Sequence, residues 1–244
     1  MTSDAPENPA PTDTVPLDVI AAATTRFFDT VRTFSDDDIT GPSLLPGWTR
    51  GHVLAHLARN ADGLVNLLLW ARTGIETPQY ASTFLRDHDI EAGAPRPPAE
   101  QLTDNEAAAE RWLALAKALT EDAWNAEVRT RQGHPIPATE VRWMRLQEIE
   151  IHHIDLNATY HPTDWPTDFV TRILAEVTAD LNRITTESVE PFTVRANDID
   201  FTATIGTSPT NTITGPGSSL AAWLLGRSAG TDLIGQLPAL PAWK

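Results

Sequence analysis

The chain contains no cysteine among its 244 residues. Disulfides, thiolate metal ligands and a thiol nucleophile from the protein itself are therefore excluded together. A metal site would have to use His, Asp or Glu side chains, and thiol chemistry would need a thiol supplied from outside. Because nothing in the sequence calls for an oxidising compartment, a cytoplasmic location is the default expectation.

Positive charge is also scarce, with 18 Lys and Arg residues against 33 Asp and Glu residues and a formal net charge of −15. The sequence has no basic run and no alternation of basic and aromatic residues, so we expect neither a nucleic acid nor an anionic membrane as partner. No apolar run reaches about 18 residues, the length that spans a bilayer. These absences leave small molecules as the expected partners and say nothing about the oligomeric state.

Hydrophobic residues make up 41% of the chain, enough for one large domain or two moderate ones. Residues 1–16 are rich in Pro, Thr and acidic residues and are interpreted as a disordered leader, not a signal peptide. Helical spacing of apolar residues predicts four long helices, at residues 17–34, 50–73, 99–120 and 140–159. Together they predict a four-helix bundle over residues 17–160. The polar segment 75–98 is predicted to be a solvated loop rather than a lid, and 133–137 a turn.

A second, smaller domain is predicted over residues 166–244, after a boundary at the proline-containing segment 161–166. A fifth helix is expected at 167–185. Runs rich in β-branched and aromatic residues then predict strands at 192–195, 200–204 and 212–214, followed by a short helix at 219–227. The predicted fold class is therefore α+β, with a helix bundle followed by a small α/β domain.

Three ionisable residues lie on one face of the predicted helix 140–159. At about 100° per residue, with Glu148 as zero, His152 falls at about +40° and Asp155 at about −20°, in the middle of the apolar stripe. Burying a carboxylate is costly unless it is paired or bound to a metal. A Glu and a His one turn apart form two ligands of a metal site, although an ion pair with a core histidine explains them equally well. Glu150 and His153 point to other sides of the helix.

His56 lies on the inward face of the predicted helix 50–73, together with Asn60 and Gly63. A single inward histidine is more often a core residue than a ligand, but the inward Glu and His on the other helix favour a ligand. A catalytic zinc needs a third protein ligand, and helix bundles build such sites from facing helices. His52 lies one turn earlier, about 40° to the other side.

Three segments resemble the mycothiol-dependent maleylpyruvate isomerases of the DinB-like superfamily. They are Leu45–Asn60, Trp143–Arg145 leading into Glu148, His152 and Asp155, and the C-terminal Leu225-Gly226-Arg227. The resemblance implies a DinB-like four-helix bundle that binds zinc, followed by a small α/β domain similar to sterol carrier proteins. It implies His56, Glu148 and His152 as metal ligands and Arg227 as the functional C-terminal arginine. Because His153 directly follows His152, the resemblance leaves two candidates there, and the helical wheel favours His152.

The reaction implied by the resemblance is the cis–trans isomerisation of maleylpyruvate to fumarylpyruvate in gentisate breakdown, a step of aromatic catabolism. A zinc ion held by two neutral histidines and one carboxylate keeps an open position that can bind a thiol and lower its pKa. Mycothiol would be that thiol. Its thiolate would add to the cis double bond, allow rotation and leave again.

The substrate carries two carboxylates, so arginines should hold it in this acidic protein. Arg227 is the first candidate, from the resemblance, and is also the expected contact for the thiol cofactor; Arg145 is the second candidate and Arg86 the third. Asp155 would either orient a ligand histidine from behind or belong to a structural polar network.

Two other functions stay open at this point. A low-molecular-weight thiol S-transferase or detoxification enzyme would share the metal site and differ in its substrate pocket, so an assay for thiol adducts would distinguish it. A non-enzymatic metal-binding regulator would close the zinc site with a fourth protein ligand, such as His52.

Overall fold

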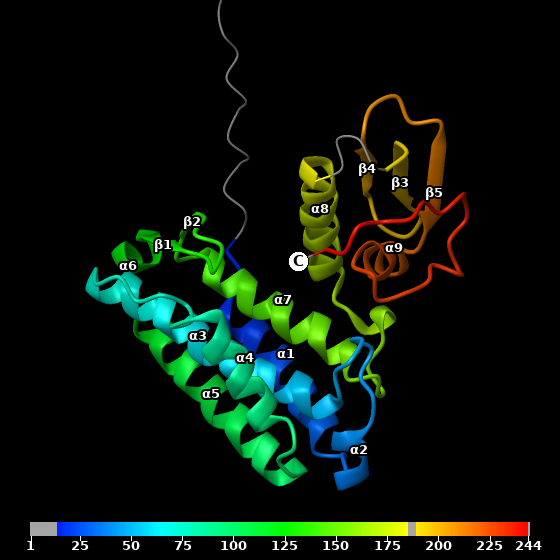
Figure 1. The fold of residues 1–244 in the computed structure, drawn as a ribbon. Helices are drawn as coiled ribbons and strands as arrows, with labels where there is room; N and C mark the ends of the chain where they lie inside the picture. The colour runs from blue at the N-terminus through cyan, green and yellow to red at the C-terminus, as the bar shows by residue number, and fades with distance from the viewer. Residues whose placement is uncertain (1–13, 185–188, 244) are drawn as a thin grey trace, which may run out of the picture. The chain divides into compact units, whose positions relative to one another are not determined.

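The computed structural model describes residues 14–184 and 189–243 (Figure 1). The leader predicted for residues 1–16 lies outside this part except for its last three residues, of which Pro16 is the N-cap of the first helix. The predicted α+β class is confirmed, since helices and two small sheets make up the fold. The chain forms two compact units, Met1–Gly41 with Thr49–Ile149 and Pro42–Trp48 with Glu150–Lys244.

The first unit is helical, and all four predicted long helices are present. Its elements are α1 (Leu17–Val31), α2 (Asp36–Thr40), α3 (Arg50–Thr73), α4 (Thr83–Gly93), α5 (Pro98–Ala118), α6 (Glu121–Asn125), β1 (Glu127–Arg129), β2 (Pro135–Pro137) and α7 (Glu140–Asp155). Helices α3 and α5 pack along one another, and α1 packs on α5. The division between the two units falls within α7, so the last turn of this continuous helix belongs to the second unit.

Helix α3 begins and ends at the residues that the sequence indicates. The Thr49 side chain accepts a hydrogen bond from the backbone N–H of His52, and the His52 side chain bonds back to the Thr49 N–H, which forms a capping box. Gly74 ends the helix in the left-handed conformation, at φ 70°. Near the start of α3, a Cβ added to Gly51 would lie 2.1 Å from the carbonyl oxygen of Ala94. The segment after α4 therefore packs directly on the α3 backbone.

Three local predictions were wrong. The segment 75–98 is not a loop throughout, because α4 forms within it and is capped by Ser82, whose side chain accepts from the Leu85 N–H. The predicted turn at 133–137 contains β2, which pairs antiparallel with β1. Two strands without further neighbours tolerate proline because an N–H on an outer edge has no partner to lose. Helix α7 ends at Asp155, four residues early, and Asn157 turns the chain at φ 50°.

The second unit contains a three-stranded sheet with two helices. Its elements are η1 (Pro162–Asp164), α8 (Thr167–Ile184), β3 (Phe192–Ala196), β4 (Thr202–Ile205), β5 (Asn211–Gly215) and α9 (Gly217–Leu224). The strand order is β4-β3-β5, antiparallel between β3 and β4 and parallel between β3 and β5. Helices α8 and α9 pack together. The ring centroids of the buried Phe192 and Trp223 side chains lie 5.7 Å apart. The three predicted strands are thus present, and their bounds differ from the predicted ones by one or two residues at one end for β3 and at both ends for β4 and β5.

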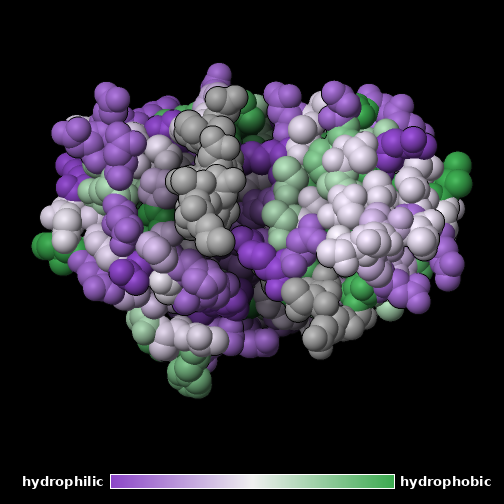
Figure 2. All heavy atoms as spheres, turned by 90° about the horizontal axis from the view of Figure 1, so that it is seen from above, coloured by the Kyte–Doolittle hydropathy of each residue, from purple (hydrophilic) through white to green (hydrophobic). Residues whose placement is uncertain are grey.

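On the face shown in Figure 2, hydrophobic residues are scattered among hydrophilic ones. Within residues 14–184 and 189–243, no helix is both long enough and apolar enough to cross a membrane.

Candidate metal centre

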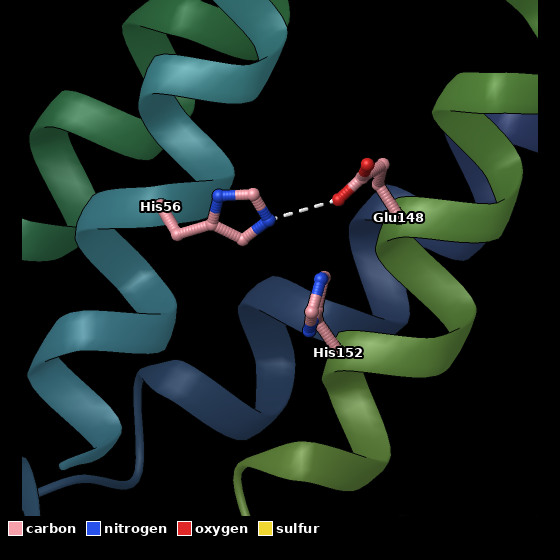
Figure 3. Close-up of side chains that lie close together, drawn as sticks. All are labelled: His56, Glu148 and His152. Carbon is pink, nitrogen blue, oxygen red and sulfur yellow. Dashed lines mark hydrogen bonds and ion pairs between the residues drawn. The ribbon is translucent and has the colours of Figure 1, made fainter. Parts of the chain in front are cut away.

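The structure brings together the three residues that were predicted as metal ligands (Figure 3). His56 projects from α3, and Glu148 and His152 project from successive turns of α7. Each offers one potential ligand atom, and these atoms all lie within 4.8 Å of one another. His56 Nε2 is 2.9 Å from Glu148 Oε2. Two residues that are 92 positions apart in the sequence are therefore in direct contact.

The chemistry of this cluster fits a divalent cation. Two imidazole nitrogens and one carboxylate are the donor set of catalytic zinc sites, in which three protein ligands leave a fourth position open. The His56 side chain is only 7% exposed, whereas the Glu148 side chain is 28% exposed. The Glu148 side chain is thus only partly covered, and binding of a cation would compensate the cost of holding these polar groups inside the fold.

Asp155 fixes the orientation of His152. The His152 Nδ1 atom lies 2.8 Å from Asp155 Oδ2, and the Asp155 side chain is fully buried. A carboxylate accepts only, so the His152 proton is assigned to Nδ1 and the lone pair to Nε2. Carboxylates behind metal-binding histidines set the tautomer and the ring orientation in this way. The geometry supports the orienting role that was one of the two predicted for Asp155.

Arg227 is bound to the same carboxylate. Its Nε donates to Asp155 Oδ1 and its Nη2 to Asp155 Oδ2, both at 3.1 Å, and its Nη1 donates to the Leu225 carbonyl at 2.8 Å. Gly226, at φ 72°, provides the left-handed turn that follows α9. Burial raises the pKa of Asp155, but the hydrogen bonds and charges of His152 and Arg227 outweigh it and lower the pKa overall. Direct contact of Arg227 with substrate or thiol stays a prediction.

Arg145 lies inside the first unit and links α7 to α3. Its side chain is buried, and its Nη1 donates to the Leu57 carbonyl at 3.2 Å and to Asn60 Oδ1 at 3.4 Å. Burial lowers the pKa of Arg145 and the nearby charge of Glu148 raises it, with a net result of about 10. The guanidinium is therefore still charged at neutral pH. The structure places Arg145 between the two ligand helices, and its predicted contact with the substrate stays a prediction.

The other two candidate histidines lie outside the cluster. His52 Nδ1 accepts the Thr49 N–H, and its Nε2 lies 3.3 Å from Glu91 Oε2. His153 is buried and stacks on the Tyr160 ring, with centroids 3.9 Å apart and an interplanar angle of 4°. His52 thus caps a helix and His153 packs in the core. Within the described residues the cluster has three members, which is the number of protein ligands in catalytic zinc sites.

Two further residues next to the cluster come from the segment that was predicted to be a loop. Arg86 Nη2 lies 3.3 Å from His56 Nδ1, and Arg86 Cζ lies 5.6 Å from the centroid of the Tyr80 ring. Burial and the charge of Glu148 raise the pKa of Tyr80. Arg86 was only the third choice for a substrate contact, and Tyr80 was missed. An isolated tyrosine before an unrecognised helix carries no periodic signal that could have found it.

A helix bundle that places two histidines and one carboxylate between facing helices has the architecture of three-ligand metal sites in helical proteins. Residues 20–157 match the model of the family described as mycothiol maleylpyruvate isomerase N-terminal domain. This match covers more than half of the chain, so the chain belongs to that family, as its resemblance implied.

Solved structures agree with this assignment. The crystal structure of the mycothiol-dependent maleylpyruvate isomerase is similar with a TM-score of 0.85 and 29% sequence identity, over 94% of this chain and 98% of that chain. A crystal structure of a histidine-to-alanine mutant of that enzyme is similar with a TM-score of 0.85 and 28% identity over the same shares. No curated protein matches the chain in sequence. Membership and fold together indicate an isomerase-type enzyme.

Proposed function

We propose that this protein is a metal- and thiol-dependent isomerase that converts maleylpyruvate to fumarylpyruvate. The observation that supports this most is the His56, Glu148 and His152 cluster, in a chain whose fold is similar to that of the mycothiol-dependent maleylpyruvate isomerase. Zinc is the proposed metal and mycothiol the proposed thiol. The proposed setting is gentisate breakdown in the cytoplasm, with small molecules as partners and no nucleic acid.

The protein's own residues would hold the metal and control its charge. His56 and His152 would bind it as neutral imidazoles, and Glu148 would neutralise one of its two positive charges. When bound, the zinc would lower the pKa of the thiol, whose thiolate supplies a nucleophile that adds reversibly to the cis double bond. Because the chain has no cysteine, it has no thiol of its own to use in this role.

Residues behind the ligands would keep the site in shape. Asp155 holds the His152 proton on Nδ1 and leaves Nε2 for the metal, while Arg227 balances the charge of Asp155. Arg145 ties the backbone of α3 to α7 and so keeps His56 opposite Glu148. These contacts favour a preorganised site, in which little rearrangement is needed when the metal binds.

The test is an assay of zinc-loaded protein with maleylpyruvate, with and without mycothiol. We expect the trans product to form only when the thiol is present, because bond rotation requires a nucleophile that the chain lacks. Full isomerisation by the loaded protein without any thiol would contradict the proposal. Loss of the thiol-dependent activity after chelation, and its return with added zinc, would support the metal requirement.

A further inference from the structure

Arg86 places a cationic side chain in contact with the cluster of candidate metal ligands. It comes from α4 and reaches His56 Nδ1 with its Nη2 at 3.3 Å. Its Nη1 lies 2.6 Å from Asp87 Oδ1, and the Tyr80 ring supports its guanidinium at 5.6 Å. The Arg86 side chain is 15% exposed, whereas that of Asp87 is 57% exposed. The guanidinium thus points inward while its carboxylate partner stays in solvent.

The contact between Arg86 and His56 requires one particular tautomer of the imidazole. An arginine donates hydrogen bonds and never accepts them, so His56 Nδ1 must be the acceptor here. The proton of a neutral His56 is then on Nε2, from which it is donated to Glu148 at 2.9 Å.

Binding of a metal through His56 Nε2 reverses this arrangement. A neutral histidine that binds through Nε2 keeps its proton on Nδ1. Two donors, the Nδ1–H of His56 and the N–H of Arg86, would then face each other. The hydrogen bond from Arg86 and coordination through Nε2 therefore exclude one another, and loading the cluster frees one edge of the guanidinium.

The freed guanidinium lies where an anionic substrate would need a partner. Two other arginines near the cluster already have defined contacts, since Arg145 bonds to α3 and Arg227 to the buried Asp155. Arginine binds carboxylates with two parallel N–H donors, and such charge-assisted bonds are the strong ones. The bond from Arg86 to Asp87 is no obstacle, because an ion pair with an exposed carboxylate is worth little in water.

We propose that Arg86 binds a carboxylate of the substrate beside the metal, and that occupation of the cluster makes its guanidinium available for this contact. The ligand class is a small dicarboxylate or 2-oxo acid. This inference rests on the proposed function and adds a residue that makes the site prefer a negatively charged substrate. It also links metal binding to substrate binding. The Arg86 guanidinium gives up its hydrogen bond to His56 when the metal binds, and it then binds the substrate carboxylate.

The test uses the full chain and the Arg86→Gln variant, with Arg96→Gln as matched control. Arg96 is a nearby exposed arginine paired with Asp104 at 3.0 Å, so the control makes the same change of charge away from the cluster. Zinc affinity is measured by competition with a chromophoric chelator. Maleate binding to the zinc-loaded proteins is measured by calorimetry without thiol, and KM and kcat for maleylpyruvate are measured with thiol.

We expect opposite effects on the two ligands. Arg86→Gln should bind zinc about three- to tenfold more tightly, because one hydrogen bond no longer has to break. It should bind maleate at least about tenfold more weakly and raise KM more than it lowers kcat, because a charged hydrogen bond is lost. The affinities of Arg86→Lys for zinc and for maleate should lie between those of the wild type and those of Arg86→Gln, since lysine keeps the charge and loses the paired donors. Arg96→Gln should change none of these quantities.

Other results would overturn the inference in distinguishable ways. If the wild type isomerises maleylpyruvate with thiol while Arg86→Gln and Arg86→Lys bind maleate as the wild type does, the role of Arg86 is wrong and the proposed function stands. Weaker zinc binding by both variants, with unchanged circular dichroism, would show that Arg86 supports His56 instead of competing with the metal. If the zinc-loaded wild type neither isomerises maleylpyruvate nor binds maleate, the proposed function and this inference fail together.

Discussion

Arg227 donates hydrogen bonds from Nε and Nη2 to the two carboxylate oxygens of Asp155, both at 3.1 Å. Asp155 Oδ2 in turn lies 2.8 Å from His152 Nδ1. The residues just after α9 are thereby connected to a candidate metal ligand on α7. An arginine in this position would influence a bound metal through two other side chains, Asp155 and His152. The direct contact of Arg227 with substrate or thiol that the sequence predicts stays a prediction beside this indirect role.

Arg227→Ala should weaken zinc binding by about tenfold, the lower end of the usual effect of losing a partner behind a metal ligand, because Arg227 contacts His152 only through Asp155. The reason is that Asp155 would lose its cation and hold His152 less firmly. Competition with a chelator measures the affinity, and turnover at saturating zinc should recover in part. Arg227→Lys is the control that keeps the charge. Unchanged zinc affinity together with a large rise in KM would instead favour direct contact with substrate or thiol.

Adjacent histidines offer a matched pair of variants. His152→Phe should abolish stoichiometric zinc binding, because a cluster of three ligands would be reduced to two. His153→Phe should keep the zinc, since His153 stacks on Tyr160 outside the cluster and a phenyl ring preserves that packing. Metal analysis of both purified proteins after dialysis gives the result. Full zinc content in His152→Phe, or loss only in His153→Phe, would show that the wrong histidine was assigned.

The fate of the thiol distinguishes the isomerase from a thiol S-transferase on the same scaffold. An isomerase regenerates the thiol, so its concentration should stay constant over many turnovers of maleylpyruvate. A transferase would consume one thiol per product and leave a stable adduct. Titration of free thiol alongside chromatography of the products measures both. Stoichiometric loss of thiol would reject the isomerase in favour of the transferase.

Gly51→Ala should destabilise the protein, although alanine is the better helix former by about 1 kcal/mol. The added Cβ would lie 2.1 Å from the Ala94 carbonyl oxygen, so the backbone after α4 would have to move. Overpacking of this kind costs typically about 1–3 kcal/mol. Urea unfolding followed by circular dichroism measures the free energy of unfolding. A gain in stability would mean that the segment after α4 moves away from α3 without cost.

Much of the fold was predictable because its signals are local. Thr49 and Gly74 mark the ends of α3 through a cap and a left-handed turn, which depend on residues close in sequence. The periodicity of α7 places Glu148 and His152 on one face, whatever that face packs against. His56 was a candidate ligand from its inward position on the helix predicted at 50–73, and the family resemblance implied the same residue as the third ligand. The sequence by itself therefore determined the fold class, the long helices and the composition of the candidate site.

Only the tertiary structure decided which groups meet around that site. Helix α4 carries few buried apolar residues, so the sequence shows only a weak helical periodicity there. In the folded chain its Ser82 cap and the contact of the segment after it with Gly51 identify the helix and its place. Arg86 is 30 residues from His56, and Arg227 is 72 residues from Asp155. Contacts over such separations depend on how whole elements pack, and side-chain spacing along one helix carries no information about them. The hydrogen-bond partners of the candidate ligands are therefore properties of the folded chain.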